Sequence, residues 1–169
     1  MKRKALLIGA PEDGESPSLD GVIVDVDRFH QYLRTPLGGA WRDDEALTVE
    51  FLTETAAFLD PVWSRQKFDA WLSKCASACV VLKACSVDEY AYDGGAEGGL
   101  YSSALIKMAQ VFEGYMETRE ERRSIVVDVA FMHRLARKEV QRLKGYKQNP
   151  DIEMPRSMKP IFPFAVFTR

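Results

Sequence analysis

"VVLKACSVDEYAYDGGAEGG", residues Val80–Gly99, joins a short apolar run to a polar, glycine-rich loop through one cysteine. The run over residues 79–84 predicts a strand that ends directly before Cys85. In an open α/β sheet, ligands bind beyond the carboxyl ends of the strands, so this cysteine stands where a substrate could meet it. Two interpretations stay open: Cys85 is a nucleophile, or it is a small side chain with a structural role, as most strand-end cysteines are.

Strands and helices alternate on both sides of this stretch. The apolar patterns predict further strands at residues 4–9, 46–53, 125–129 and 161–167, and helices at residues 20–34, 61–75, 100–115 and 131–143. Residues 125–129 also fit the lead-in to the helix after them, and Pro163 indicates an edge strand or a strand entry. The alternation predicts an α/β fold, a three-layer α/β/α sandwich with a mostly parallel sheet, in a single domain over residues 1–169.

The composition is that of a globular domain without a strong charge bias. Hydrophobic residues make up 46% and charged residues 28%, and 23 basic residues against 25 acidic ones leave a net charge of −2. This balance gives no reason to expect nucleic acid or an anionic membrane as a partner. No apolar run approaches the ~18 residues of a membrane span, and the run over residues 5–8 is too short for a signal peptide, so we expect a cytoplasmic protein.

The three cysteines, Cys75, Cys79 and Cys85, form neither a disulfide pattern nor a metal pattern. An odd number in a reducing compartment argues against a disulfide framework, and no paired C-x-x-C is present to hold zinc. The two histidines, His30 and His133, fall in predicted helices, where a surface or half-buried position is the simplest interpretation. We therefore predict no metal and no cofactor.

The loop after Cys85 also allows two interpretations. Its glycines suit a mobile loop that closes over a substrate, and they equally suit a connector with no further role. The turn "IGAPEDG" (Ile8–Gly14) lacks the Lys-Ser/Thr of a phosphate loop and is interpreted as a plain turn, and the acidic cluster Arg42–Glu45 as a solvated loop.

Several segments, taken in order along the chain, resemble the caspase and metacaspase family of cysteine peptidases. "KALLIG" and "LDGVIVDVDRFHQYL" resemble the first strand, the Gly-x-x-x-Asp element and the first helix of that family. "VVLKACSVDEYAYD" resembles the strand that ends on the catalytic cysteine, and "GGLYSSALIKMA" the start of the small subunit. "KQNPDIEMPRSMKPIFPFAVF" resembles the closing segment, which often contains Gln-x-Pro and a final Pro-Phe strand.

The resemblance assigns roles to individual residues. It implies that Cys85 is the nucleophile and that Asp25 lines the pocket for a basic side chain before the scissile bond. Lys83 and Ser86, which flank the cysteine strand end, are assigned to substrate binding. The implied substrate is a polypeptide, and the implied fold is the same three-layer sandwich.

The resemblance also divides the chain. Residues 1–85 correspond to a large-subunit-like part, residues 86–99 to the loop that family members often cut, and residues 100–169 to a small-subunit-like part.

The chain departs from the family pattern in three places. The family carries its catalytic histidine in a Gly-His-Gly-like motif before the cysteine strand, and no such motif is present. The second helix passes almost directly into the cysteine strand through "SKCASA", so either the remaining strands pair directly or a segment is missing from the chain. Lys83 stands where metacaspases commonly carry an acidic residue. The positive charge of Lys83 opposes the binding of a basic side chain in the pocket.

Two functions of different classes follow. The first is a caspase-like cysteine endopeptidase in which the Cys85 thiolate attacks a peptide carbonyl, with activity impaired by the absent histidine motif. The alternative is a non-catalytic caspase-like module, a pseudo-peptidase that acts through a protein partner; a homodimer is one assembly that stays open. A doubly wound domain that binds a small ligand is a third, fold-level interpretation.

Overall fold

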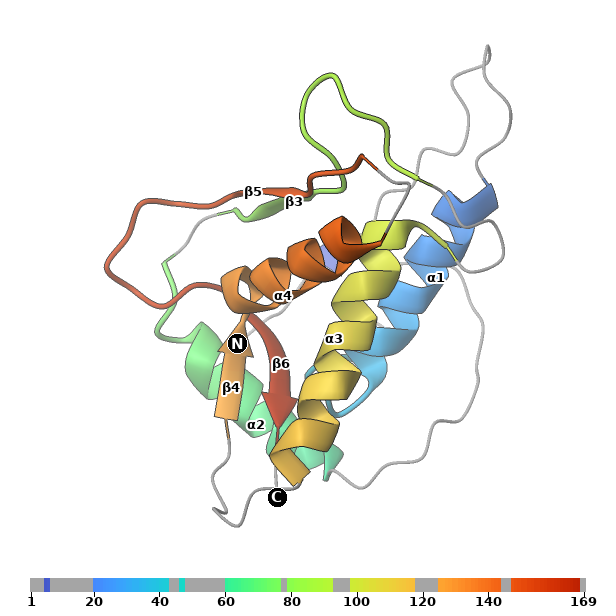
Figure 1. Ribbon diagram of the computed structural model, residues 1–169. Coiled ribbons are helices and arrows are strands. Elements are labelled where there is room, and N and C mark those ends of the chain that lie inside the picture. The colour runs from blue at the N-terminus through green and yellow to red at the C-terminus, as the bar shows by residue number, and fades with distance from the viewer. Residues whose placement is uncertain are drawn as a thin grey trace.

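The computed structural model describes residues 5–6, 20–42, 46–47, 60–76, 79–92, 98–117, 125–143 and 147–167. Helices and strands alternate along the chain as far as the last helix, as the sequence predicted, and two strands follow that helix (Figure 1). In order they are β1 (Ala5–Leu6), α1 (Asp20–Arg34), β2 (Ala46–Leu47), α2 (Pro61–Leu72), β3 (Val81–Lys83), α3 (Leu100–Glu117), β4 (Ile125–Asp128), α4 (Val129–Arg142), β5 (Asp151–Glu153) and β6 (Pro163–Phe167).

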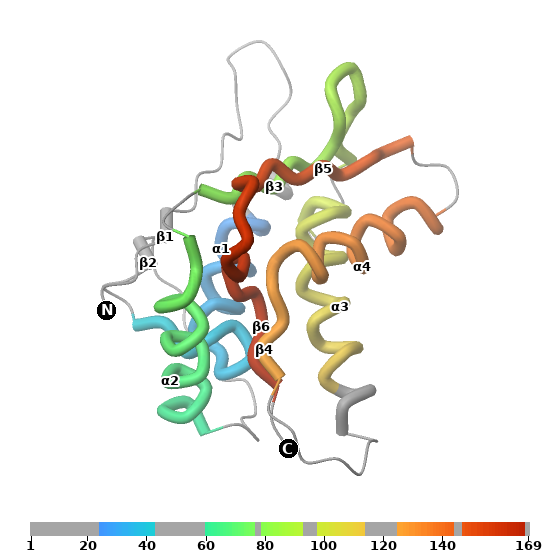
Figure 2. Tube along the Cα trace, turned by 90° about the vertical axis from the view of Figure 1, so that its left-hand side faces the viewer, coloured from blue at the N-terminus to red at the C-terminus, as the bar shows by residue number. Residues whose placement is uncertain are grey.

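The centre of the fold is the antiparallel ladder between β4 and β6. Its register pairs Ile125 with Phe167 and Val127 with Ala165, and it becomes irregular between Val127 and Asp128. Helix α2 packs against one side of this ladder, and α3 and α4 pack against the other (Figure 2). The described elements therefore form an α/β arrangement in which a short sheet lies between helices.

Strand β6 is the most buried element of this arrangement. All residues of Pro163–Phe167 are buried, because the strand is covered on both faces. Val166 packs with the fully buried Phe68 of α2. Phe167 faces the other way and meets Phe112 of α3 edge to face, with 4.9 Å between ring centroids. Burial on both faces explains why the sequence here is a continuous apolar run and does not alternate.

The other two described strand pairs are shorter. Strand β3 pairs antiparallel with β5, and β1 pairs parallel with β2. The α/β class therefore holds, whereas a mostly parallel sheet is not confirmed by these pairs. The rest of the strands predicted at residues 4–9 and 46–53 lies outside the described residues, as does the turn predicted at Ile8–Gly14.

Several element boundaries differ from the prediction by a few residues, and hydrogen bonds account for two of them. Helix α2 ends at Leu72, before the predicted end at Cys75, because the N–H groups of Lys74 and Cys75 bond to the carbonyls three residues earlier. Helix α4 begins directly after β4, where the Asp128 carboxylate accepts a hydrogen bond from Phe131 N at 2.8 Å. Residues 125–129 thus serve as a strand and as the entry to the helix.

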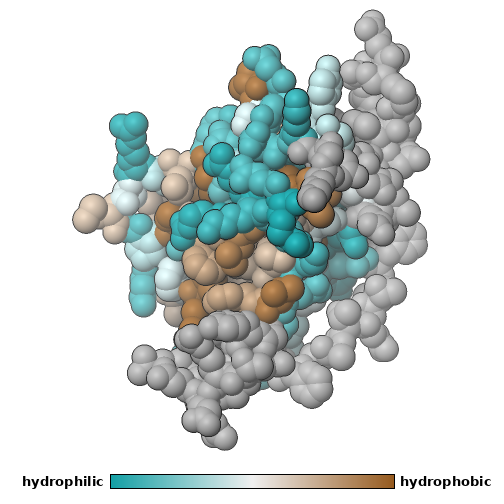
Figure 3. Space-filling view, in the orientation of Figure 1, coloured by the Kyte–Doolittle hydropathy of each residue, from teal (hydrophilic) through white to brown (hydrophobic). Residues whose placement is uncertain are grey.

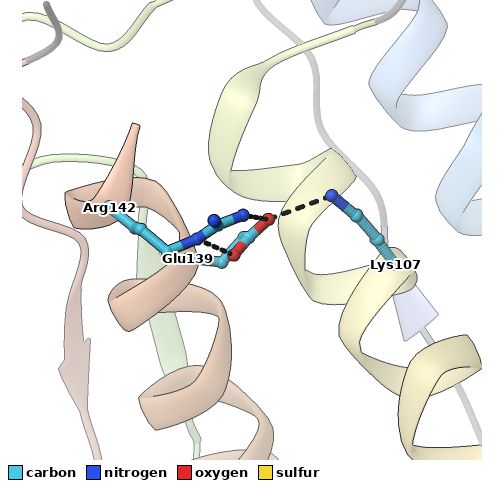
Figure 4. Close-up of polar contacts among 3 residues, drawn as sticks. All are labelled: Lys107, Glu139 and Arg142. Atoms are coloured by element: carbon cyan, nitrogen blue, oxygen red, sulfur yellow. Dashed lines mark hydrogen bonds and ion pairs between the residues drawn. The ribbon is translucent and has the colours of Figure 1, made fainter. Parts of the chain in front are cut away.

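A largely buried carboxylate, that of Glu139, joins α3 to α4. Glu139 of α4 accepts hydrogen bonds from Lys107 Nζ of α3 at 2.9 Å and from Arg142 Nε at 3.0 Å and Nη2 at 3.1 Å (Figure 4). The hydrogen bonds from Arg142, and then that from Lys107, lower the pKa of Glu139 from its ordinary 4.5 to about 2. The ionised form is the one that the folded protein stabilises.

We expect Glu139→Gln to destabilise the protein at neutral pH by about 1 kcal/mol or less, because both cations are largely exposed and screened. The pKa of Glu139 is lower in the folded state than in the unfolded state. The wild type is therefore more stable than Glu139→Gln above about pH 4.5, and this difference in the free energy of unfolding is lost as the pH falls toward 2. Urea unfolding of both proteins between pH 7 and pH 3 measures this. Lys138→Gln, an exposed charge on the same helix, is the control. A difference in the free energy of unfolding between wild type and Glu139→Gln that is the same at pH 7 and at pH 3 contradicts the prediction.

Candidate functional site

Cys85 lies two residues beyond the end of β3, at the start of a loop that returns toward α3. Its side chain is half-buried, and its Sγ lies 3.3 Å from the Glu89 carbonyl oxygen, to which the thiol donates. The predicted location at a strand end is confirmed. The thiol is neither deep in the core nor fully in solvent.

The loop that carries Cys85 is held by the carboxylate of Glu89. This carboxylate accepts hydrogen bonds from Ser86 N at 3.3 Å, from Asn149 N at 2.8 Å and from Asn149 Nδ2 at 2.5 Å. The hydrogen bonds from Asn149, chiefly that of its side chain, hold the pKa of Glu89 below its ordinary value. Ser86 Oγ in turn donates to the Asn149 carbonyl at 2.9 Å. The hydroxyl predicted to bind substrate therefore joins the loop to residue 149.

The side chain of Gln148 bonds to both ends of the same loop. Its side chain is only 2% exposed. Its Nε2 donates to the Ala84 carbonyl at 2.8 Å, and its Oε1 accepts from Tyr92 N at 3.0 Å. One buried amide therefore connects the first and last residues of the segment 84–92, which fixes the path of the chain on both sides of Cys85.

Lys83 points to the neighbouring strand. Its ammonium forms an ion pair with Glu153 of β5, across the β3–β5 ladder. The hydrogen bond to Glu153 raises the pKa of Lys83. In the structure, the cation assigned to substrate binding is thus partnered by a carboxylate of its own chain.

Asp25 of α1 organises the start of α3. Its Oδ1 accepts from Gly99 N at 2.7 Å, and its Oδ2 accepts from Ser102 Oγ at 2.9 Å. A Cβ on Gly98, whose φ is +75°, would lie 2.3 Å from Asp25 Oδ1, and one on Gly99 would lie 2.5 Å from Oδ2. The two glycines therefore allow the carboxylate to approach the backbone. Asp25, the residue assigned to a specificity pocket, thus caps α3, a helix far from it in the sequence.

Both histidines of the chain are buried, which corrects the prediction of surface or half-buried positions. His133 of α4 is 3% exposed, and its Nδ1 shares a hydrogen bond of 2.7 Å with Tyr101 OH of α3. Burial lowers the pKa of His133. His30 of α1 is 5% exposed, and its Nε2 has no hydrogen-bond partner among the described residues. His133 can be buried between α3 and α4 because the hydroxyl of Tyr101 is a hydrogen-bond partner for one of its ring nitrogens.

The structure therefore groups the assigned residues in two places. Cys85, Lys83 and Ser86 share the β3 strand end, and Asp25 lies at the N-terminus of α3. Sequence reasoning did not single out Glu89, Gln148 and Asn149, which hold the thiol loop. The Gln-x-Pro pattern at residues 148–150 was the signal that could have found two of them, since it marks the segment that contacts the loop.

Two classes of site find no support in the described part of the chain. It holds no group of three histidine, cysteine or acidic side chains placed to bind a metal ion. It also holds no helix with the length and apolar character needed to cross a membrane.

Comparison with known proteins identifies the family of the chain. A model of the caspase domain family of peptidases matches residues 72–162, more than half of the chain. The chain belongs to the caspase domain family. The matched range contains β3, the Cys85 loop and the segment around Gln148. No curated protein and no solved structure matches the chain.

We expect Asp25→Ala to destabilise the protein by about 1 kcal/mol, because the backbone N–H of Gly99 and the hydroxyl of Ser102 lose their acceptor. Asp25→Asn keeps one carbonyl oxygen for Gly99 N and should lose less. Urea unfolding of the three proteins measures the difference. Asp27→Ala, on the same helix, is the matched control. Equal losses at positions 25 and 27 would show that Asp25 does not cap α3.

Proposed function

We propose that this caspase-family chain is a non-catalytic module that acts by binding a protein partner. Membership of the family suggests a cysteine peptidase-like function. One observation carries the narrower proposal: the two histidines of the chain, His30 and His133, are both buried in helices, and neither is hydrogen-bonded to the thiol of Cys85.

The chemistry of a cysteine nucleophile explains why this observation matters. The thiolate is the attacking species, and a nearby base or positive charge must favour it at neutral pH. The thiol of Cys85 instead donates to the Glu89 carbonyl, and the Nδ1 of His133 is occupied by Tyr101. General acid–base catalysis contributes roughly 10²–10⁴-fold to a rate, so its loss leaves little turnover.

The endopeptidase is the second candidate, and the position of the thiol favours it. Cys85 follows a strand end, is half-buried and stands on a loop whose course is fixed by Gln148. In this alternative Cys85 attacks the peptide carbonyl, and Asp25, Lys83 and Ser86 line the substrate site. Lys83 would first have to leave Glu153 in order to meet a substrate.

Under either candidate, we take the chain as a single caspase-like domain over residues 1–169. Its parts are a large-subunit-like portion (1–85), a connecting loop (86–99) and a small-subunit-like portion (100–169). The complete sheet is proposed to be mostly parallel, within a three-layer sandwich. The partner is a polypeptide, no cofactor takes part, and the site of action is the cytoplasm.

Thiol reactivity separates the two candidates. The protein is treated with iodoacetamide at neutral pH, and the modification of each cysteine is followed by peptide mass spectrometry. Cys79, which is exposed, is the internal reference, and Cys75, half-buried with a pKa raised by burial, is the slow reference. We expect Cys85 to react no faster than Cys79, because in the described part of the chain its thiol donates to a carbonyl oxygen and is not hydrogen-bonded to a histidine.

Peptide cleavage gives the second readout. Peptides with Arg, Lys or Asp before the scissile bond are incubated with the wild type and with Cys85→Ala. The non-catalytic proposal expects equal, background rates from the two proteins. Cleavage by the wild type that disappears in Cys85→Ala, together with rapid alkylation of Cys85, would replace the proposal with the endopeptidase.

A further inference from the structure

Two exposed segments of opposite charge leave the β3–β5 ladder. We call residues 86–92 the acidic loop and residues 154–160 the basic strap. Both carry large apolar side chains in solvent. The strap projects to the left in Figure 1, and the same region of Figure 3 shows hydrophilic and hydrophobic residues side by side.

The acidic loop presents an apolar tip beside an exposed carboxylate. Val87 is 85% exposed and Tyr90 is 84% exposed, with the exposed Asp88 between them. The acidic loop contains two acidic residues, Asp88 and Glu89, and no Lys or Arg. The hydrogen bonds of Glu89 and Gln148 to the loop and its neighbours hold this tip in one shape, so little order has to be gained when it binds.

The basic strap has the complementary chemistry. Met158 is fully exposed, at 105%, and Met154 is 46% exposed. The exposed Arg156 and Lys159 have no ion-pair partner among the described residues, and the strap contains no acidic residue. Its far end is anchored, since the Ile161 carbonyl accepts hydrogen bonds from Trp71 Nε1 at 2.8 Å and from Cys75 Sγ at 3.3 Å.

The strand register keeps the two segments apart within one chain. Lys83 pairs with Asp151 at one end of the ladder, and Val81 pairs with Glu153 at the other. The acidic loop continues from the first end, and the strap continues from the second. They therefore leave in different directions, as Figures 1 and 2 both show. A contact between them requires two copies of the chain.

We propose that the acidic loop of one copy binds the basic strap of a second copy. Asp88 faces Lys159 and Arg156 across this contact, and Tyr90 packs against the thioether of Met158, a favourable sulfur–aromatic contact. One such contact leaves a free strap on the first copy and a free loop on the second, which form the same contact reciprocally in a two-fold dimer or bind further copies head-to-tail. This self-association goes beyond the proposed function, since it involves neither the thiol nor a partner protein.

Sedimentation of the full chain under reducing conditions tests the proposal, with reductant present so that Cys79 cannot form a disulfide between copies. We expect a monomer of 19.1 kDa at low concentration and a mass that rises with concentration. The contact is small and exposed, so the affinity should be weak, in roughly the micromolar to millimolar range. Raising the salt from about 50 mM to about 500 mM should weaken it, because the charges are screened.

Charge reversal identifies the surfaces. Lys159→Glu and Asp88→Lys should each weaken association by roughly threefold to tenfold. The double variant D88K/K159E restores opposite charges across the contact and should recover association. Lys138→Glu on α4 changes the net charge equally at an exposed position outside both segments, and should have no effect.

Several results would overturn the proposal. They are a mass of 19.1 kDa at every concentration, an effect of Lys138→Glu equal to that of Lys159→Glu, or a double variant that associates no better than the single ones. Circular dichroism of each variant verifies that it folds, and Arg156→Glu serves in place of Lys159→Glu should that variant not fold.

Discussion

The buried amide of Gln148 is the constraint on which the thiol site depends. It bonds to the carbonyl of Ala84 and to the N–H of Tyr92, so it fixes both ends of the segment that contains Cys85. An amide that is 2% exposed cannot give up these bonds cheaply, because water does not replace them. The position of Cys85 is therefore set by a residue more than sixty positions later in the chain.

The same constraint extends to the helices. Tyr92, whose N–H bonds to Gln148, accepts a hydrogen bond from Leu100 N at 3.0 Å, where α3 begins. One residue earlier, Gly99 N bonds to the Asp25 carboxylate of α1. A continuous series of hydrogen bonds thus joins residue 148, the thiol loop, α3 and α1. These hydrogen bonds explain how a short loop of polar residues can hold one shape beside a small two-stranded ladder.

Much of the secondary structure could be predicted from local pattern, and the exceptions have physical causes. Helix α1 was found because its apolar residues recur at helical spacing, and β6 because it is a continuous apolar run. Strand β5 was missed because "DIE" carries no apolar pattern and its strand conformation comes from pairing with β3. The burial of His133 was missed because it depends on Tyr101, which lies 32 positions earlier.

The sequence by itself determined the α/β class, the order of most elements, the place of Cys85 after a strand and the resemblance to the caspase family, because these are properties of local pattern and motif. Only the tertiary structure decided that Asp25 caps α3, that Lys83 is paired with Glu153 and that both histidines are buried. The physical reason is that charge pairing, capping and burial depend on side chains from distant parts of the chain, whose approach no local spacing reveals.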